Sequence, residues 1–330
     1  MRILVDSRWF GFSGIGRYAA EILNRAPEDI QIDLLQNRWK ISNPLTPIML
    51  GRSIRNSKAD IFWSPGFMPP LMPRKPCVIT MHDLIHLHHG TNFQKLYYNH
   101  VIKKLIRECR YILTDSNYSR NEIISWSGLS ENKVIKIPLG VSDEFHIYGA
   151  TYNPGYPYVL YVGNRRRYKN LPRLVAAFCM ACKGGSAKLI LTGQKDQALT
   201  EIAGSFGCAD QIEFIGILDD SKLSNLYRGA SAVVYPSLYE GFGLPPLEAM
   251  ACGAPVVCSN VTSVPEIVGK AAILINPLDT DEMANAIKKV IGDKNLRAEL
   301  KKRGIIHAKE YTWNNTAKLT WKILKSIKDE

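Results

Sequence analysis

The sequence lacks any apolar run long enough to cross a membrane, which takes about 18 to 20 residues. Its first residues, MRILVDSRWF, are typical of a strand and lack the charged and apolar regions of a secretory signal peptide. The seven cysteines are scattered, odd in number and mostly set among apolar residues, which excludes a disulfide-rich secreted scaffold. These absences predict a cytoplasmic protein.

Three familiar ligand motifs are incomplete. Cys179 and Cys182 form a C-x-x-C pair inside a helical run, but no second pair completes a zinc site, so we expect them to pack in the core. The histidines within 82–89 have no carboxylate partners or helix to present them, and no metal is expected there either. Gly14 and Gly16 lack the third glycine of a dinucleotide-binding turn, which excludes NAD binding.

Acidic residues are fewer than basic ones, 30 against 42, and the net charge is +12. Residues 1–155 hold 19 basic and 13 acidic residues, and residues 156–330 hold 23 and 17, so each half carries the same excess of six. No basic tail therefore explains the charge. A polyanionic substrate or an acidic membrane surface is the expected class of partner.

The 330 residues suggest two domains, at roughly 150 residues per domain. Short apolar runs alternate with helical patterns in both halves, which predicts an α/β fold with parallel sheets covered by helices on both faces. Residues 144–157 have no periodicity and are the expected linker. We therefore predict two Rossmann-like doubly wound domains facing a cleft, over residues 1–150 and 151–310. A helix over 311–330, with Trp313, Leu319 and Ile323 or Leu324 on one face, should pack back on the first domain.

The most informative stretch is YPSLYEGFGLPPLEAMACGAPVVCS, residues 235–259. A strand ends at Tyr235, and a glycine-rich loop carries Glu240 to a helix that opens with two prolines and stops at Gly253. Free N–H groups at such a helix start favour an anion, and ligands bind at this edge of open α/β sheets. Glu240 suits sugar hydroxyls or a positively charged transition state. Glu248 suits either a ribose diol or stabilisation by the helix dipole.

This stretch resembles the signature of retaining glycosyltransferase family 4, with two glutamates separated by seven residues, the first in an E-G-F-G-L loop and the second in an L-E-A-M-A helix. The resemblance implies the two-domain GT-B fold and retention at the anomeric carbon. It implies that Glu240 lies near the donor sugar and that Glu248 binds the ribose. The implied loop contacts to sugar and phosphate come from Phe242, Gly243 and Leu244.

A second motif, YVGNRRRYKNLPRL over 161–174, places four cations between a strand and a helix. Cations at that turn could clamp a diphosphate and stabilise the charge that grows on it as the glycosidic bond breaks. A solvated basic loop is the alternative. The family resemblance implies that Lys169 and either Arg165 or Arg166 hold the diphosphate. Many relatives have arginine where this chain has Tyr168, which leaves the choice of arginine open.

Three shorter motifs also resemble the family. FSGIGRY, residues 12–18, looks like the glycine turn that faces the donor phosphates and the acceptor, through Gly14 and Gly16. TMHD, residues 80–83, places His82 near the donor sugar, while Asp83 orients the ring or meets the acceptor. The nucleotide base region implied by the resemblance contains Gly216 and Leu218.

The resemblance implies a hexosyltransferase similar to bacterial mannosyltransferases of O-antigen or capsule synthesis. We expect mannose to pass from GDP-mannose to a glycan or polyprenyl-linked glycan, without metal or cofactor and without nucleic acid as partner. UDP-glucose or a UDP-N-acetylhexosamine is the alternative donor, and a GT-B sugar-nucleotide epimerase is the alternative enzyme. A hydrolase using both glutamates would need no cationic clamp. A non-catalytic basic binder would not be expected to keep both Glu240 and Lys169.

Residues 93–110 mix five cations with aromatic residues in a helical pattern. Such a helix can lie on an anionic membrane, and it can equally be an ordinary surface helix. The family resemblance implies lipid-linked acceptors. Peripheral contact with the inner face of the cell membrane is therefore kept as a hypothesis.

Overall fold

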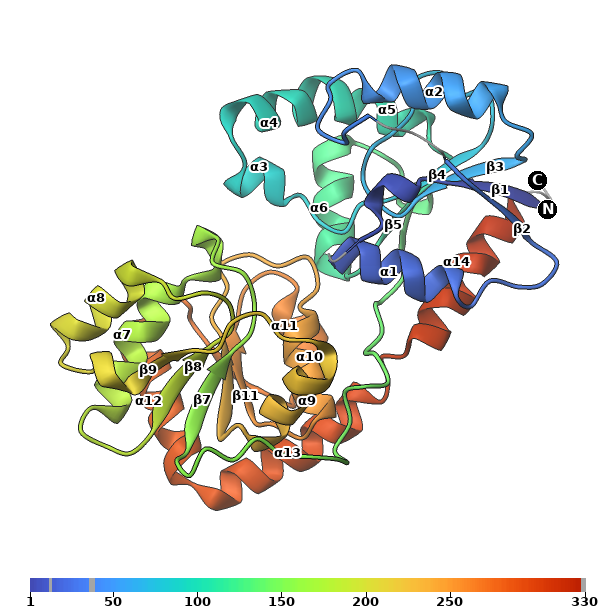
Figure 1. Ribbon diagram of the computed structural model, residues 1–330. Coiled ribbons are helices and arrows are strands. Elements are labelled where there is room, and N and C mark those ends of the chain that lie inside the picture. Colours follow the sequence, from blue (N-terminus) through green and yellow to red (C-terminus); the bar gives the residue numbers. More distant parts are fainter. Residues whose placement is uncertain (12–13, 36–38, 328–330) are drawn as a thin grey trace. The chain divides into compact units, whose positions relative to one another are not determined.

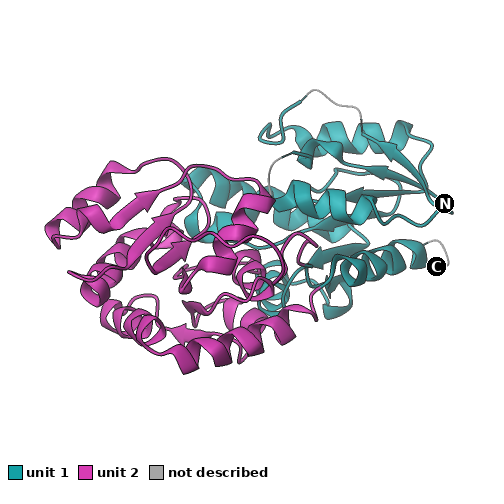
Figure 2. Cartoon of the chain, turned by 60° about the horizontal axis from the view of Figure 1, so that its bottom comes forward, with its two compact units in different colours: residues 1–140, 312–330 teal, residues 141–311 magenta. Residues whose placement is uncertain are grey.

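The computed structural model describes residues 1–330 apart from residues 12–13, 36–38 and 328–330. The chain forms two compact units (Figure 2): unit 1 consists of residues 1–140 and 312–330, and unit 2 consists of residues 141–311. Each unit is built around its own six-stranded parallel sheet.

The sheet of unit 1 has the order β2-β1-β3-β4-β5-β6. Its strands are β1 (Arg2–Val5), β2 (Gln31–Leu34), β3 (Ile61–Ser64), β4 (Cys77–Thr80), β5 (Tyr111–Thr114) and β6 (Val134–Lys136). Its longer helices are α1 (Gly14–Leu23), α2 (Thr46–Asn56), α6 (Asn117–Ser127) and α14 (Trp313–Ser326). Shorter segments are η1 (Ser7–Trp9), α3 (Ile85–His89), α4 (Asn92–Tyr97), the π-helical η2 (Tyr98–Ile102), α5 (Lys103–Leu105), η3 (Ile106–Glu108) and η4 (Glu131–Lys133).

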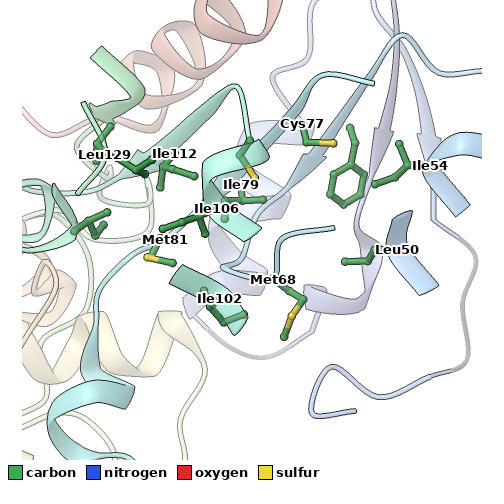
Figure 3. Close-up of a cluster of buried hydrophobic side chains, with 14 of the residues drawn as sticks. Leu50, Ile54, Met68, Cys77, Ile79, Met81, Ile102, Ile106, Ile112 and Leu129 are labelled. Atoms are coloured by element: carbon green, nitrogen blue, oxygen red, sulfur yellow. The ribbon is translucent and has the colours of Figure 1, made fainter. Parts of the chain in front are cut away.

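Helices cover both faces of this sheet. On one face, Leu50 and Ile54 of α2 pack with Ile79, Ile102 and other buried side chains (Figure 3). On the other face the Trp63 ring meets Tyr18 of α1 at 6.0 Å and Trp321 of α14 at 6.1 Å between centroids. Successive strand residues point to opposite faces, so a strand buried on both faces must be apolar throughout.

The last helix, α14, packs on unit 1 beside α1. The Trp321 indole N–H donates to the Ile22 carbonyl at 3.1 Å, and the Thr316 hydroxyl donates to the Pro138 carbonyl at 2.7 Å. The buried face includes Trp313, Trp321 and Leu324, whereas Leu319 is only half-buried. The face expected from the sequence is therefore rotated toward Trp321. The expected span 311–330 includes residues 328–330, which lie outside the described residues.

We expect Trp321→Phe to lower the free energy of unfolding of the chain by about 1 kcal/mol, because it removes the indole hydrogen bond and leaves the Ile22 carbonyl with only the Arg25 N–H, at 3.2 Å, while keeping a ring in place. Urea denaturation measures the change. Lys318→Ala, on the exposed side of the same helix, is the control and should leave the stability unchanged. Equal stability of the two variants would show that this hydrogen bond does not hold the helix.

The sheet of unit 2 has the order β12-β11-β10-β7-β8-β9. Its strands are β7 (Tyr158–Tyr161), β8 (Lys188–Leu191), β9 (Ile212–Phe214), β10 (Ala232–Tyr235), β11 (Val256–Ser259) and β12 (Ile273–Ile275). Its helices are η5 (Arg167–Lys169), α7 (Leu171–Cys182), α8 (Gln197–Ser205), η6 (Ala209–Gln211), α9 (Asp220–Gly229), α10 (Leu244–Ala251), α11 (Val264–Val268), α12 (Thr280–Gly292) and α13 (Lys294–Ala308). Helices α7, α8 and α12 gather on one face of the sheet, and α9 and α10 on the other (Figure 1).

The predicted fold class, with parallel sheets covered by helices, is confirmed. The first unit gives way to the second at residue 140 rather than at 150. The expected linker, 144–157, is bound to unit 2: the Arg228 guanidinium donates to the Ala150 carbonyl at 2.7 Å, and the Phe145 ring meets Tyr227 edge-on at 5.8 Å. The chain therefore enters the second unit before its first strand begins.

The helix expected near 93–110 is broken into α4, η2, α5 and η3. The π-helical turn begins at Tyr98, whose ring is buried against Phe67, His86 and Trp126. This packing supplies a reason for the irregular turn, because π-helical turns shift the register of a helix. The expectation of one continuous amphipathic helix is wrong.

All seven cysteines are free thiols, and six of them are buried. Cys179 packs in the core as expected, whereas Cys182 is only half-buried. No helix in the described part of the chain is long and apolar enough to cross a bilayer.

Candidate functional site

The point where the strand order of unit 2 reverses lies at β7 and β10. Along the chain, β7 is the first strand of unit 2, and in the sheet it lies between β10 and β8. The loops that leave the carboxyl ends of β7 and β10 therefore diverge at this position, which is where open α/β sheets bind ligands. These loops carry the two strongest sequence motifs, residues 161–174 and 235–259.

Lys169 and Glu240, one from each loop, form a buried ion pair. Lys169 Nζ lies 2.6 Å from Glu240 Oε1, and their side chains are 8% and 12% exposed. Lys169 Nζ also donates to the Tyr235 hydroxyl at 2.8 Å. Burial, followed by the nearby Glu240 carboxylate, raises the pKa of Tyr235 well above its usual value, so its hydroxyl stays neutral. The structure thus brings together two residues that the sequence motifs predicted separately.

The turn before α7 presents Lys169. Residues 167–169 form the short helix η5, and Asn170 follows with a left-handed φ of 62°. The Asn170 amide donates to the carbonyls of Pro236 and Pro277, at 3.1 and 2.7 Å, which holds the turn against the loop after β10. Helix α7 begins as expected, with Pro172 in its first turn and no side-chain cap on its N–H groups.

The Glu240 loop is held by the segment that precedes α11. The Glu240 N–H donates to the Thr262 hydroxyl at 3.2 Å, and the Ser263 hydroxyl donates to the carbonyls of Glu240 and Phe242. Gly243 has a φ of 106°, which disfavours any side chain there. These contacts hold the loop through its main chain.

Helix α10 offers fewer donors to an anion than an ordinary helix start. Pro245 and Pro246 lack N–H groups, so only Leu244 donates from the first three positions. The Phe242 side chain is buried and packs edge-on against Tyr311 at 5.9 Å between centroids, which leaves its backbone as the part able to meet a ligand. Anion binding here depends on Leu244 and the glycine loop.

Glu248 is the fifth residue of α10 and is 6% exposed. The Tyr227 hydroxyl donates to its carboxylate at 3.2 Å, and Tyr227 is fully buried. Its position beyond the first turn weakens the helix-dipole explanation. A buried carboxylate that keeps a fixed orientation is what recognition of a diol requires, and that role stays a prediction.

Arg165 and Arg166 differ sharply in environment. The Arg165 guanidinium donates to the Thr192 carbonyl at 3.0 Å, lies 3.7 Å from Asp196 and stacks over the Phe214 ring at 4.8 Å. Its Nη1 is buried and makes no hydrogen bond. The Arg166 side chain is exposed, with no ion pair among the described residues. The geometry therefore favours Arg165 as the pre-positioned cation.

Gly216 lies where β9 ends, with a left-handed φ of 75°. Its backbone exchanges two hydrogen bonds with Gly193, at 2.6 and 3.1 Å. Leu218 follows two residues later and is half-buried. This places the predicted base-binding residues at the same edge of the sheet as the Arg165 loop.

In unit 1, His82 follows β4 and uses both ring nitrogens. Nδ1 lies 2.7 Å from Asp115 Oδ2, and Nε2 lies 3.0 Å from the Pro65 carbonyl oxygen. Both partners accept hydrogen bonds, so the doubly protonated ring satisfies both. Burial alone lowers the pKa of His82, but Asp115 and the Pro65 carbonyl outweigh it and raise the pKa.

Both ring nitrogens of His82 are hydrogen-bonded to Asp115 and Pro65 rather than to Asp83. The charge of Asp83 helps to raise the pKa of His82, and the alternative role predicted for Asp83, meeting the acceptor, stays a prediction. Its carboxylate accepts from the Ile85 N–H at 2.9 Å, so it begins the turn into α3. Asp115, at the end of β5, orients the ring instead. The carboxylate hydrogen-bonded to the ring thus comes from Asp115, which is distant in sequence. The carboxylate of Asp83, next to His82 in sequence, accepts from the backbone of Ile85.

Gly14 and Gly16 lie at the start of α1, while Phe12 and Ser13 of the same motif lie outside the described residues. A Cβ on Gly16 would lie 2.1 Å from the Gly11 carbonyl oxygen, so only glycine fits there. Gly14 is exposed, and a Cβ on it would meet nothing within 4 Å. Gly16 therefore has a packing reason for its identity, and Gly14 is the one open to a ligand.

Among the described residues no group of three or more histidine, cysteine or acidic side chains is placed to hold a metal ion. The region 85–89, expected to be a polar loop, forms the short helix α3. Its His86 ring packs against Phe67 and Tyr98 at 5.4 and 5.3 Å, and His88 lies 2.5 Å from Glu122.

Several residues that contact the predicted positions, within one unit or the other, escaped the sequence reasoning. They are Asp115, Thr192, Asp196, Tyr227, Tyr235 as a hydrogen-bonding group, Thr262 and Ser263. Most follow the end of a predicted strand, which is the one signal that could have marked them.

Asp115→Asn should lower the pKa of His82, because it removes the carboxylate that favours the imidazolium form. Because the pKa of His82 is raised in the folded chain, protonation of the ring stabilises the fold. This contribution is fully present below pH 6.5, the usual pKa of histidine. That gain is lost as pH rises through the raised pKa. NMR titration of the His82 ring measures the shift. An unchanged pKa would show that Asp115 does not control the ring.

Comparison with known proteins bears on the whole chain. The family model for Glycosyltransferase Family 4 matches residues 12–145, and the model for Glycosyl transferases group 1 matches residues 147–307. The O-antigen chain mannosyltransferase B of Escherichia coli is 27% identical, over 93% of this chain and 94% of that protein. The serotype-specific mannosyltransferase WbdA of Escherichia coli is 30% identical over 73% of this chain, which covers 32% of that longer protein.

A solved structure supports the fold. Anabaena Alr3699/HepE in complex with UDP and glucose aligns with a TM-score of 0.80, over 99% of this chain and 100% of that chain, at 17% identity. The GT-B architecture predicted from the sequence is therefore confirmed. With one family model on each half and a relative matched along nearly its full length, the chain belongs to the family 4 glycosyltransferases.

Proposed function

We propose that this chain transfers a hexose with retention from a nucleoside-diphosphate sugar to a glycan or polyprenyl-linked glycan, without a metal ion. GDP-mannose is the proposed donor and mannose the proposed transferred sugar. O-antigen or a related surface polysaccharide is the proposed product. The observation that carries the proposal is the buried Lys169–Glu240 pair at the strand switch point of unit 2. The names of the mannosyltransferase relatives support the choice of sugar.

Lys169 can bind the leaving diphosphate because one of its three N–H groups remains for a ligand. An ammonium group has three N–H donors, and two of them are donated to Glu240 and Tyr235. The third can reach a phosphate oxygen. Arg165 Nη1 is a second donor without a hydrogen-bond partner at the same edge. Together they would stabilise the negative charge that develops on the departing diphosphate.

The proposed step breaks the bond between the anomeric carbon and the phosphate oxygen and forms a bond from that carbon to the acceptor oxygen on the same face. The acceptor proton passes to the departing phosphate. Positive charge develops on the sugar, and the Glu240 carboxylate stabilises it electrostatically. Glu248 would bind the ribose, Gly216 and Leu218 would lie near the base, and the backbone of residues 242–244 and Gly14 would meet the sugar and phosphates.

Unit 1 is the proposed acceptor domain, at the cytoplasmic face of the membrane. Phe93 and Leu96 of α4 are 65% and 59% exposed and lie close in sequence to Lys95. An exposed apolar pair beside cations suits an anionic bilayer surface. Sedimentation with vesicles containing anionic lipid tests this contact. Wild type should sediment and Phe93→Ser/Leu96→Ser should not, whereas equal sedimentation would contradict the proposal.

The donor is tested with a thermal-shift panel of GDP, UDP, ADP, GDP-mannose and UDP-glucose in EDTA. A ligand that binds the folded chain raises its melting temperature by linkage. A rise with guanine nucleotides alone supports the proposed donor, and a rise with uracil nucleotides alone replaces it with a UDP-sugar. No rise with any nucleotide contradicts the donor site.

The reaction is tested by following the anomeric proton by NMR with a glycan acceptor. An α-linked product from an α-linked donor supports retention, and a β-linked product overturns it. Turnover of the donor into an epimer without acceptor would favour the epimerase alternative.

A further inference from the structure

Arg8 Nη1 and Trp39 Nε1 are two of the buried side-chain atoms of unit 1 that have no hydrogen-bond partner in the part of the chain that the structure describes. They are neighbours, because the Arg8 guanidinium carbon lies 5.7 Å from the centroid of the Trp39 ring. Buried polar groups in native proteins nearly always have a partner, so two adjacent exceptions need an explanation. The chemistry proposed above uses neither residue.

The Arg8 guanidinium is locked in place. Its Nε and Nη2 donate to the two carboxylate oxygens of Asp6 at 2.7 Å each, and Asp6 is fully buried. The Trp9 indole and the Ser64 hydroxyl donate to the same carboxylate, each at 3.2 Å. The Arg8 side chain is 5% exposed. With two of its nitrogens bound to Asp6, Arg8 presents Nη1 in one fixed direction.

Trp39 comes from the segment that follows the neighbouring strand. β1 and β2 are paired, the Leu35 N–H donates to the Val5 carbonyl at 2.8 Å, and the Ser7 hydroxyl donates to the Leu35 carbonyl at 2.7 Å. These bonds hold the segments after β1 and β2 together. Both donors therefore lie at the carboxyl edge of the unit 1 sheet, the edge where such sheets bind ligands.

The chemistry of the two donors defines the ligand class. Guanidinium and indole nitrogens donate and cannot accept, so the missing partner must supply acceptor oxygens. Asp6 already balances the Arg8 charge, so an added oxyanion would be held by the two directed N–H groups rather than by an unpaired cation. Helix α1 contacts η1, and its N-terminal end contributes positive potential to this region. A carboxylate or phosphate meets these requirements, whereas a cation or an apolar group does not.

We propose that Arg8 and Trp39 form an oxyanion-binding site for a phosphate or carboxylate group on the acceptor substrate. This inference rests on the proposed transfer reaction for the identity of the ligand, but the site itself can be tested without turnover. Both nitrogens are buried, whereas the Trp39 side chain as a whole is half-buried. Asp6 is the residue that positions Arg8.

The first test measures inorganic phosphate binding to the full chain by thermal shift, against chloride at equal ionic strength. Saturating nucleoside diphosphate is present, so that the site in unit 2 is occupied. We expect a saturable rise in melting temperature. Trp39→Phe should weaken phosphate binding about tenfold, the factor that corresponds to one charge-assisted hydrogen bond. Arg8→Lys, which keeps the charge beside Asp6, should weaken it as well.

Trp126→Phe is the matched control, because its indole N–H already donates to Asn99 Oδ1 at 2.8 Å within the same unit. It should bind phosphate as the wild type does. Equal phosphate affinity of the Trp39→Phe and Trp126→Phe variants, or no saturable binding to the wild type, would overturn the site.

The second test asks whether the bound oxyanion belongs to the acceptor substrate or is free phosphate. With an acceptor that carries a phosphate or carboxylate, Trp39→Phe should raise the acceptor KM and leave the donor KM unchanged, and free phosphate should compete with the acceptor. Phosphate binding without competition would overturn the assignment to the acceptor. If no donor and acceptor pair reacts at all, the proposed function fails, while the phosphate titration still decides whether the site exists.

Discussion

Glu240→Ala is expected to lower kcat by about 10²–10³-fold, the usual cost of removing one electrostatic stabiliser of a transition state. Glu240→Gln should lower kcat by a similar factor, because the amide keeps an acceptor for Lys169 but lacks the charge that opposes positive charge on the sugar. The backbone of the loop should stay in place, since Thr262 and Ser263 hold it through main-chain atoms of residues 240 and 242.

Steady-state kinetics with saturating donor and acceptor measure the effect. Glu299→Gln is the control, because Glu299 forms an exposed ion pair with Arg303 in α13 and should not affect turnover. A kcat of Glu240→Gln equal to that of the control would remove Glu240 from the mechanism. The affinity for nucleoside diphosphate, measured by calorimetry, shows whether the donor site is still formed.

The strands could be predicted from the sequence because parallel strands covered on both faces are short apolar runs. RILV, IFWS and CVIT are such runs, and each is a strand of the unit 1 sheet. The helix starting at Leu171 could also be predicted, since Pro172 marks its first turn. These signals are local, so they can be recognised without knowledge of the tertiary structure.

The broken helix over 93–110 could not be predicted, because its π-helical turn accompanies the packing of Tyr98 against rings from distant segments. The contacts between site residues could not be predicted for the same reason, because they join segments that are distant in sequence. Nothing near His82 in sequence points to Asp115, which lies 33 residues away and arrives through the pairing of β4 with β5. Residue types at strand ends could be predicted, but which of them meet depends on the order of strands in the sheet.

Lys169→Met is expected to have two separable effects. It leaves Glu240 as a buried carboxylate without a cation, which should lower the free energy of unfolding by about 3–5 kcal/mol. It also removes the donor proposed for the diphosphate, which should weaken nucleoside-diphosphate binding by about tenfold or more. Urea denaturation measures the first effect, and calorimetric titration measures the second.

The double variant Lys169→Met/Glu240→Gln distinguishes a structural lysine from one that also binds phosphate. Removing both charges relieves the unpaired carboxylate, so stability should recover much of what Lys169→Met loses. Affinity for the nucleoside diphosphate should not recover, because the ammonium group is still missing. If affinity recovers together with stability, Lys169 acts only by holding Glu240, and the diphosphate must be bound by Arg165 and the loop amides alone.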